Sequence, residues 1–561
     1  MAIEALLLLQ HSDVRALAAD GARWADLPLV CIDPGILADA LAAGLPAERL
    51  DYRPLPVERR FLARAATEAM SRALVLDQAL AREREVLIPD AEVLGWNHVP
   101  LRFLFLRALI ARRLGVLCDA AFPEARIGLL RPEVPSQFYF DSFLVAEAFA
   151  SSSMRFRLVE GYDTVLHRVE GIPSHCYDFE WLGHRLAHGV DALVHLPTVW
   201  SHRARFVGEV LQRYPQSVDL PSPLWDLPVG TDRCPLRPVQ AAQITPALRV
   251  FELRVAQRVS EALQDLGCAP AAREAQAAEL AAICVQQMLQ FIGLRAALAG
   301  RSVPIILTEH DTGVVGPLFS LAHLMKAPVT VVPHSSYPTQ PLPHAFQVTA
   351  LEREGFASTV RTVLGERVRT RAVRVTPQRA APVRERIRSV CLLVNTLSGR
   401  GISHIDLSGL VGLYQSLERV CRAQGIVLAV RLKPGAALLD VAAPALGCDR
   451  TRLQATLDQP LEQLAAQTDV CIAFGELSSG LIDFLEAGAL ALHASDESRS
   501  TDLVNASALS TLHSLDCLQT AQVPHWLETL LCDPMQYRTR CRLQQAEWDA
   551  RRLPAADRFF D

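Results

Sequence analysis

One stretch near the C-terminus, residues 470–488, constrains the fold more than any other part of the chain. A short apolar run that starts at Val470 gives way to small and polar residues and then to apolar residues at helical spacing. This pattern predicts a buried strand that turns directly into a helix. In an open parallel sheet, ligands bind at such a turn, beyond the carboxyl end of the strand. Ser478, Ser479 and the first N–H groups of the helix could all donate to one anionic oxygen there.

Composition narrows the class of protein. A chain of 561 residues is long enough for two or three domains with sizeable cores. Half of the residues are hydrophobic and 21% are charged, which is typical of a globular enzyme. The net charge of −5 provides no basic footprint, so a nucleic acid is not expected as a partner. The 13 cysteines include no CxxC pair, which favours buried thiols in a reducing compartment.

The apolar segments predict a cytoplasmic protein without a membrane-spanning helix. The N-terminus carries Glu4 ahead of a short apolar run and does not resemble a signal peptide. No uninterrupted apolar run reaches the roughly 18 residues that a spanning helix needs. The segment 101–117 is apolar but contains four arginines, which predicts an amphipathic helix with snorkelling arginines. The alternative is a peripheral contact with the inner membrane, where a lipid-linked substrate would be presented.

The first third of the chain alternates between short strands and helices. Apolar runs at 5–9, 28–33 and 49–52 predict strands, and glycines and prolines mark the turns between them. Apolar residues recur every three or four positions from 57 to 85, which predicts a long helix packed on a sheet. Together these elements indicate alternating βα units.

Residues 151–244 form an irregular, polar and Pro-rich region in which an acceptor could bind. Carboxylates can bind or deprotonate sugar hydroxyls, so we predict Asp232 and Glu160 as catalytic residues and Asp226 as a substrate contact. For Asp232 the alternative is a plain surface ion pair with an arginine. His184 and His188 stand four residues apart, but no third ligand is evident, and no metal site is predicted.

A βαβ unit follows a helical, Ala- and Leu-rich scaffold at 245–300. Runs at 303–308 and 329–332 predict two buried strands, each followed by polar residues. Because parallel strands end at the same edge of a sheet, the polar residues of both ends should line one site. We predict Glu309 as catalytic and a set of substrate-binding residues that comprises His310, His334 and Ser335. The alternative is that this polar stretch merely caps the following helix.

The charge pattern divides the chain into domains. Between residues 361 and 388 there are nine arginines and two glutamates, which indicates a basic linker between two βα arrays. We therefore predict an N-terminal domain at 1–360, with the irregular region as an insertion. A C-terminal nucleotide-binding domain should occupy 389–540, and a helical tail 541–561.

The C-terminal domain presents polar groups at three predicted strand ends. Gly399 and Arg400 follow the first strand, Lys433 follows the second, and the double serine follows the third. Cations, hydroxyls and N–H groups suit a phosphate, and Asp483, one turn into the last helix, suits the hydroxyls of a ribose. These residues are predicted to bind a nucleotide.

Two Rossmann-like halves with a C-terminal helix that could cross back resemble the GT-B glycosyltransferases. This resemblance implies an α/β fold of two Rossmann-like domains that face a cleft. Lys433-Pro434, followed by Ser478-Ser479 and then by Asp483, is similar to the motifs of bacterial transferases that use CMP-activated sugars. In those sialyltransferases and Kdo transferases, a Lys-Pro-His-Pro-like segment and a double serine hold the CMP phosphate. Here Gly435 stands where that family usually has histidine, and Leu490 where proline is common.

The resemblance implies a metal-independent glycosyltransferase without a cofactor. It would move Kdo or a related ulosonic acid from a CMP-activated donor to a glycan or lipid-linked oligosaccharide acceptor in bacterial capsule or lipopolysaccharide synthesis. Some Kdo transferases of this group retain the anomeric configuration with an Asp nucleophile, which Asp232 and Glu160 could provide as a pair. The alternatives are a GT-B transferase or epimerase that uses a UDP- or GDP-sugar, and a catalytically inactive sugar-binding scaffold.

Overall fold

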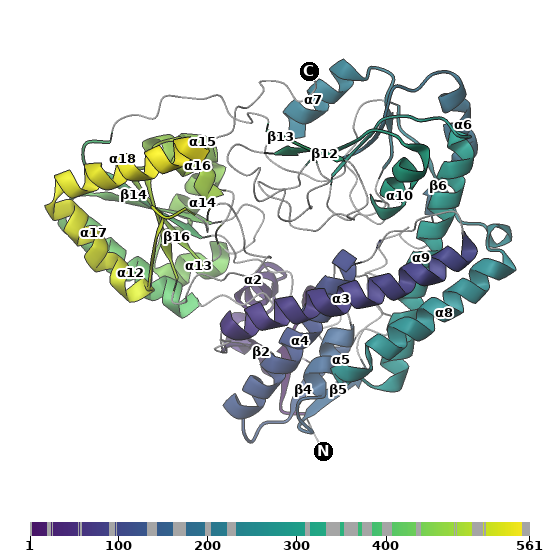
Figure 1. Cartoon of the computed structure of the whole chain (residues 1–561). Coiled ribbons are helices and arrows are strands. Elements are labelled where there is room, and N and C mark those ends of the chain that lie inside the picture. Colours follow the sequence, from purple (N-terminus) through teal and green to yellow (C-terminus); the bar gives the residue numbers. More distant parts are fainter. Residues whose placement is uncertain are drawn as a thin grey trace.

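The fold is described from a computed structural model, shown in Figure 1. The structure describes residues 3–19, 24, 26–53, 55, 59–88, 96, 98–131, 143–160, 175–196, 203–221, 232–308, 315–332, 348–352, 369–372, 384–394, 407–432, 439–475, 477, 480–495, 509 and 512–551.

Three wholly parallel sheets organise the described residues. The first has the order β3 (Leu50–Tyr52), β2 (Leu29–Cys31), β1 (Ala5–Leu8), β4 (Ile127–Arg131) and β5 (Phe156–Glu160). The second has the order β13 (Arg369–Ala372), β12 (Val348–Glu352), β11 (Val329–Val332), β10 (Ile305–Thr308), β7 (Leu193–His195) and β8 (Val218–Asp219). The third has the order β15 (Val427–Leu432), β14 (Ser389–Val394), β16 (Val470–Phe474), β17 (Leu490–Ala494) and β18 (Asp516–Leu518). A separate antiparallel pair consists of β6 (His175–Tyr177) and β9 (Leu236–Pro238).

Helices accompany each sheet. With the first sheet come α1 (His11–Ala19), α2 (Pro34–Ala42), α3 (Arg59–Leu87), α4 (His98–Ala121) and α5 (Phe143–Ala150). With the second come α6 (Phe179–Ala187), α7 (Arg203–Arg213), α9 (Pro270–Leu298) and α10 (Val315–Met325), whereas α8 (Pro246–Ala262) packs against α9 and α3. With the third come α12 (Leu407–Ala423), α13 (Leu439–Leu446), α14 (Arg450–Asp458), α15 (Leu461–Gln467), α16 (Gly480–Glu486), α17 (Val523–Cys532) and α18 (Pro534–Arg551).

The predicted fold class, α/β with Rossmann-like domains, is confirmed by these sheets. The range predicted as one N-terminal domain, 1–360, nevertheless contains two sheets, and β13 lies within the predicted linker at 361–388. Two strands of the second sheet that the sequence did not indicate are very short: β7 has three residues and β8 has two. Such strands are too short to produce an apolar run that stands out from irregular sequence.

The first two sheets share one hydrophobic core, built around α9. Leu7 and Leu129 of the first sheet and Leu193 and Leu307 of the second belong to the same cluster of buried side chains. α9 lies between them and packs against α5, α6, α8 and α10. It is long and apolar enough to cross a membrane, but 72% of its most apolar window is buried inside the structure, which is the pattern of a core helix.

Trp96 joins α3 to α10 within this shared core. Its indole N–H donates to Ser320 Oγ of α10 over 2.7 Å, and the guanidinium of Arg84 on α3 lies 4.6 Å from the centre of its ring. A Cβ on Gly316 would come within 2.6 Å of this tryptophan, so only glycine allows α10 to approach so closely. Arg84 itself is fully buried and lies 3.7 Å from the carboxylate of Asp77. The two sheets are therefore held together by side chains packed between helices.

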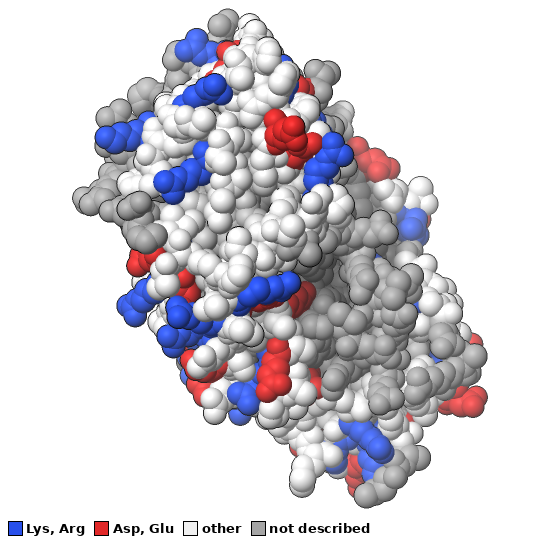
Figure 2. Space-filling view, turned by 90° about the vertical axis from the view of Figure 1, so that its right-hand side faces the viewer, with Lys and Arg blue, Asp and Glu red and all other residues white. Residues whose placement is uncertain are grey.

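The arginines of α4 contact the protein. Arg102 is buried, Arg112 donates to the carbonyl of Asp265, and Arg113 lies 5.9 Å from the centre of the Phe61 ring. These contacts agree with an amphipathic helix that packs through its arginine stems. On the face shown in Figure 2, basic and acidic side chains are interspersed among the described residues. Pairs such as Arg258 with Glu83, between α8 and α3, have the geometry of ordinary surface ion pairs.

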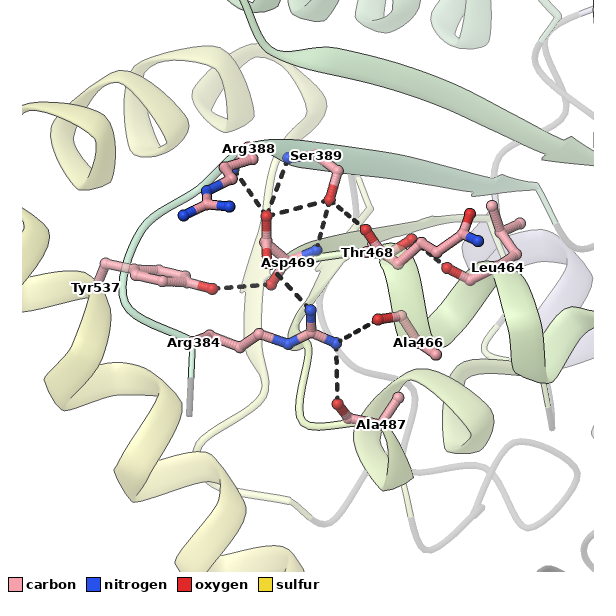
Figure 3. A network of polar contacts seen from close by, with 10 residues as sticks. Arg384, Arg388, Ser389, Leu464, Ala466, Thr468, Asp469, Ala487 and Tyr537 are labelled. Atoms are coloured by element: carbon pink, nitrogen blue, oxygen red, sulfur yellow. Dashed lines mark hydrogen bonds and ion pairs between the residues drawn. The ribbon is translucent and has the colours of Figure 1, made fainter. Parts of the chain in front are cut away.

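A buried carboxylate, Asp469, closes the amino-terminal edge of the third sheet (Figure 3). Its Oδ2 accepts hydrogen bonds from the backbone N–H of Arg388 at 2.8 Å and of Ser389 at 3.1 Å, at the start of β14. Its Oδ1 accepts from Arg384, whose guanidinium also donates to the carbonyl oxygens of Ala466 and Ala487. The Tyr537 hydroxyl donates to the Asp469 carbonyl and so attaches α18 to the same point. α18 therefore packs on the third sheet.

We expect Asp469→Ala to lower the free energy of unfolding by about 3 kcal/mol, because it leaves a mostly buried arginine and two strand N–H groups without their acceptor. A urea titration measures the change. Asp549→Ala is the matched control, since its carboxylate is exposed and accepts from Gln545 one turn earlier on α18. This control should stay within about 0.5 kcal/mol of wild type. Equal stability of the two variants would contradict the role given to Asp469.

Candidate functional site

The third sheet has one edge at which ligand binding is expected from topology alone. The chain runs from β14 to β15 on one side and then returns to β16 on the other side of β14. The switch in direction therefore lies between β14 and β16, and ligands of doubly wound sheets bind beyond the carboxyl ends of the strands at that point. The register places Val394 opposite both Leu432 and Phe474, so three of the strands end at the same level.

Most of the predicted nucleotide-binding residues follow these aligned strand ends in the chain. Gly399, Arg400, Lys433, Ser478 and Ser479 lie outside the described residues. The strands that immediately precede them are described and end together, as predicted. The positions of the strand ends are thus as predicted, and the role of these residues in nucleotide binding stays a prediction.

Asp483, the remaining predicted nucleotide ligand, lies in the first turn of α16 and is half-buried. α16 has only seven residues, so its macrodipole is short. The part of its first N–H groups in anion binding stays a prediction.

His493, which the sequence prediction missed, contacts the turn after β16. Its Nε2 lies 2.6 Å from the carbonyl oxygen of Gly475, and the Cys517 thiol lies 3.6 Å from its Nδ1. The histidine itself, five residues after the stretch 470–488, was visible in the sequence. Its contact with a residue 18 positions earlier depends on strand pairing, which no local pattern reports.

The second sheet repeats the topology of the third. In chain order its strands are arranged 2-1-3-4-5-6, and the third sheet has the arrangement 2-1-3-4-5. Its switch point lies between β7 and β10. Thr308 and Val332 lie opposite each other, so the strand ends before Glu309 and His334 are level, as predicted. Glu309, His310, His334 and Ser335 themselves lie outside the described residues.

His195 ends β7 at this switch point, and the sequence did not assign it a role. The side chain is fully buried, and its Nδ1 lies 2.8 Å from the carbonyl oxygen of Leu220. A carbonyl can only accept, so Nδ1 carries the proton. Burial lowers the pKa of the imidazole to about 4, so the ring is neutral at physiological pH. It joins the ends of β7 and β8 as a neutral hydrogen-bond donor.

The carboxylates predicted in the middle region lie at different sheets. Asp232 is held by Arg185 of α6, whose Nε donates over 2.9 Å, and its backbone carbonyl accepts from Asp219 at the end of β8. Glu160 is the last residue of β5 in the first sheet. Asp226 lies outside the described residues. The ion pair of Asp232 matches the alternative considered for it, an acid–arginine contact that fixes the chain.

His184 and His188 stack on α6 with their ring centres 4.3 Å apart. His188 Nδ1 contacts the His184 carbonyl over 2.8 Å. Within the described part of the chain, no group of three His, Cys, Asp or Glu side chains is arranged to hold a metal ion. These two histidines therefore have a local contact that accounts for their spacing.

Comparison with known proteins finds likeness among solved structures only. No protein-family model and no curated protein matches the chain. The glycosyltransferase SnogD from Streptomyces nogalater is 15% identical, with a TM-score of 0.33 and coverage of 64% of this chain and 96% of its own. UDP-GlcNAc 2-epimerase from Neisseria meningitidis, bound to UDP-GlcNAc, is 10% identical, with a TM-score of 0.32 and coverage of 64% and 95%. At such identities and TM-scores, the function of this chain has to be inferred from its own residues.

We expect the buried His195 to make folding pH-dependent. Its pKa is about 4 in the folded chain and 6.5 in the unfolded chain, so between these values only the unfolded chain binds the proton. Its contribution to stability is complete above pH 6.5 and is lost as the pH falls toward 4, by about 3 kcal/mol in total. Urea titrations at several pH values should show a shallower pH dependence for His195→Gln than for wild type. Parallel curves would contradict this assignment.

Proposed function

We propose that the chain is a GT-B glycosyltransferase that moves Kdo or a related ulosonic acid from a CMP-activated donor to a glycan or glycolipid acceptor. The reaction would serve bacterial surface polysaccharide synthesis and take place in the cytoplasm or at the inner membrane. The proposal is supported by the two sheets of like topology, one for each substrate. Each sheet has a switch point whose strand ends lead into polar residues suited to one half of the reaction.

One observation carries the proposal further than the others: the position of Lys433. The chain has 56 basic residues, Lys and Arg together, but only two of them, Lys326 and Lys433, are lysines. Lys433 directly follows Leu432, the last residue of β15, whose end is level with the switch point. Lysine is a compact point charge, whereas arginine is a planar fork. A lysine at this position, in a chain that otherwise relies on arginine, fits a single phosphate.

The donor chemistry requires charge stabilisation on the leaving group. A CMP-sugar leaves through one phosphate, and that phosphate gains negative charge as the glycosidic bond breaks. Lys433, Ser478 and Ser479 would stabilise this charge, and Gly399-Arg400 would approach it from the neighbouring strand end. Asp483 would bind ribose hydroxyls. Together these side chains meet the demand of the reaction without a metal ion.

The acceptor needs a group that removes its hydroxyl proton. Among the three predicted catalytic carboxylates, Glu309 directly follows Thr308 at the switch point of the second sheet. We favour Glu309 as the general base, with His310, His334, Ser335 and Asp226 around the acceptor. The pair predicted for a retaining reaction, Asp232 and Glu160, is less favoured, because Asp232 is engaged by Arg185 and Glu160 ends a strand of the first sheet.

Loss of Lys433 should weaken nucleotide binding. We expect Lys433→Ala to raise the Kd for CMP by about 10- to 100-fold, because a charge-assisted contact contributes about 1.5–3 kcal/mol. Lys433→Arg should not restore the affinity, since the fork does not fit where the ammonium does. Lys326→Ala is the matched control. Calorimetric titration with CMP, UDP and GDP measures the affinities and identifies the base.

The small number of lysines allows a second readout of the same claim. Reductive methylation followed by mass spectrometry can follow Lys433 and Lys326 separately, and CMP should protect only Lys433. Equal labelling of Lys433 with and without saturating nucleotide would contradict its place at the phosphate. Tighter binding of UDP or GDP than of CMP would leave the fold assignment intact and replace the proposed donor.

Glu309→Gln should abolish transfer while leaving nucleotide binding intact. A missing general base typically costs 10²- to 10⁴-fold in rate. Release of CMP from a CMP-ulosonic acid in the presence of acceptor measures turnover. Asp232→Asn is the comparison variant, and turnover near wild type is expected because Asp232 is engaged by Arg185. The reverse result, with Asp232→Asn inactive and Glu309→Gln active, would assign the catalytic role to Asp232.

A further inference from the structure

A row of three side chains crosses the third sheet near its carboxyl edge. Ala473 of β16 lies opposite His493 of β17, which lies opposite Cys517 of β18. Residues in register in a parallel sheet point to the same face. Ala473 and Ala491 belong to the core cluster that contains Leu481 and Phe484 of α16. His493, two residues after Ala491, therefore lies on the face that α16 covers.

The contacts of His493 define its tautomer. Nε2 is 2.6 Å from the carbonyl oxygen of Gly475, and a carbonyl oxygen has no proton to donate. Nε2 must therefore carry the proton. Nδ1 is then an acceptor in the neutral ring, and the Cys517 thiol, 3.6 Å away, can donate to it. Both ring nitrogens are engaged, so the orientation of the imidazole is held from two strands.

The carbonyl that His493 contacts belongs to a residue with a special backbone conformation. Gly475 has φ of +85°, in the left-handed region that glycine adopts without steric cost. A Cβ added there would meet no described atom within 4 Å, so glycine is needed for its conformation and not for lack of space. The chain leaves β16 at this residue and enters α16 five positions later. The conformation of Gly475 thus sets the direction in which the chain leaves β16.

We propose that His493, oriented by Cys517, is a positioning residue for the turn between β16 and α16. By holding the Gly475 carbonyl, it fixes where the chain begins its path to the double serine. The link to nucleotide affinity rests on the proposed function, whereas the link to the turn does not. Burying an imidazole costs desolvation free energy that an apolar side chain would avoid, so its two hydrogen bonds, and not space filling, explain a histidine here.

Two substitutions separate the hydrogen bond from the shape of the ring. His493→Phe keeps a ring and removes the donor, and His493→Gln keeps an N–H donor. Amide hydrogen exchange is measured on peptides that span 471–486, and CMP affinity is measured by titration. We expect His493→Phe to exchange at least 10-fold faster in this segment and to bind CMP about 10-fold more weakly. His493→Gln should recover part of both effects.

His525→Phe, on the exposed face of α17, is the matched control and should change neither quantity. Unchanged exchange and CMP affinity within twofold of wild type in His493→Phe would overturn the inference. If wild type binds no nucleotide but the exchange change is present, the proposed function fails and the positioning role stands. If wild type binds CMP and His493→Phe changes nothing, the positioning role fails and the function stands.

A second variant keeps the inference falsifiable where His493→Phe does not fold. Cys517→Ala removes the group that orients the ring and leaves the imidazole in place. It should raise exchange in the same segment by a smaller factor, and Cys517→Ser, which keeps a donor, should restore it. Exchange in Cys517→Ala equal to that of wild type would overturn the proposal.

Discussion

The carboxylate of Asp469 holds the third sheet together at the edge where its strands begin. It binds the first N–H groups of β14 and the guanidinium of Arg384, and its backbone carbonyl receives the Tyr537 hydroxyl from α18. Where parallel strands begin and end, backbone N–H and C=O groups need hydrogen-bond partners, and Asp469 provides an acceptor for two N–H groups at the start of β14. This network lies at the opposite end of the strands from the candidate site, whose position follows from the switch point between β14 and β16.

Much of the second half of the fold could be predicted from the sequence, because its strands are apolar on both faces. The strand predicted to start at Val470 is β16, and the strand predicted to end before Lys433 is β15, whose last residue is Leu432. The alignment of their ends followed from the rule that parallel strands share a direction. Two kinds of feature could not be predicted: strands of two or three residues, such as β8, and side-chain contacts such as that of His493 with Gly475. These contacts join residues that only the assembled sheet brings together.

The first sheet is the main departure from the predicted organisation in two domains. Its strand order places β1 in the middle, in the sequence 3-2-1-4-5, and it shares a core with the second sheet through α9. α2, which belongs to the first sheet, contacts α13 of the third sheet, and Ala38 of α2 is buried in the core of the third sheet. The elements of the first sheet, which has a switch point of its own between β1 and β4, thus pack against both of the other sheets. A range predicted as one domain has one continuous core but two sheets.

The central claim is that a nucleotide phosphate binds at the carboxyl edge of the third sheet, between β14 and β16. A crystal structure of the protein with CMP tests it most directly. The account predicts the phosphate within hydrogen-bond distance of Ser478 or Ser479 and of Lys433, with the ribose beside Asp483. A nucleotide bound instead at the switch point of the first sheet, between β1 and β4, would contradict it.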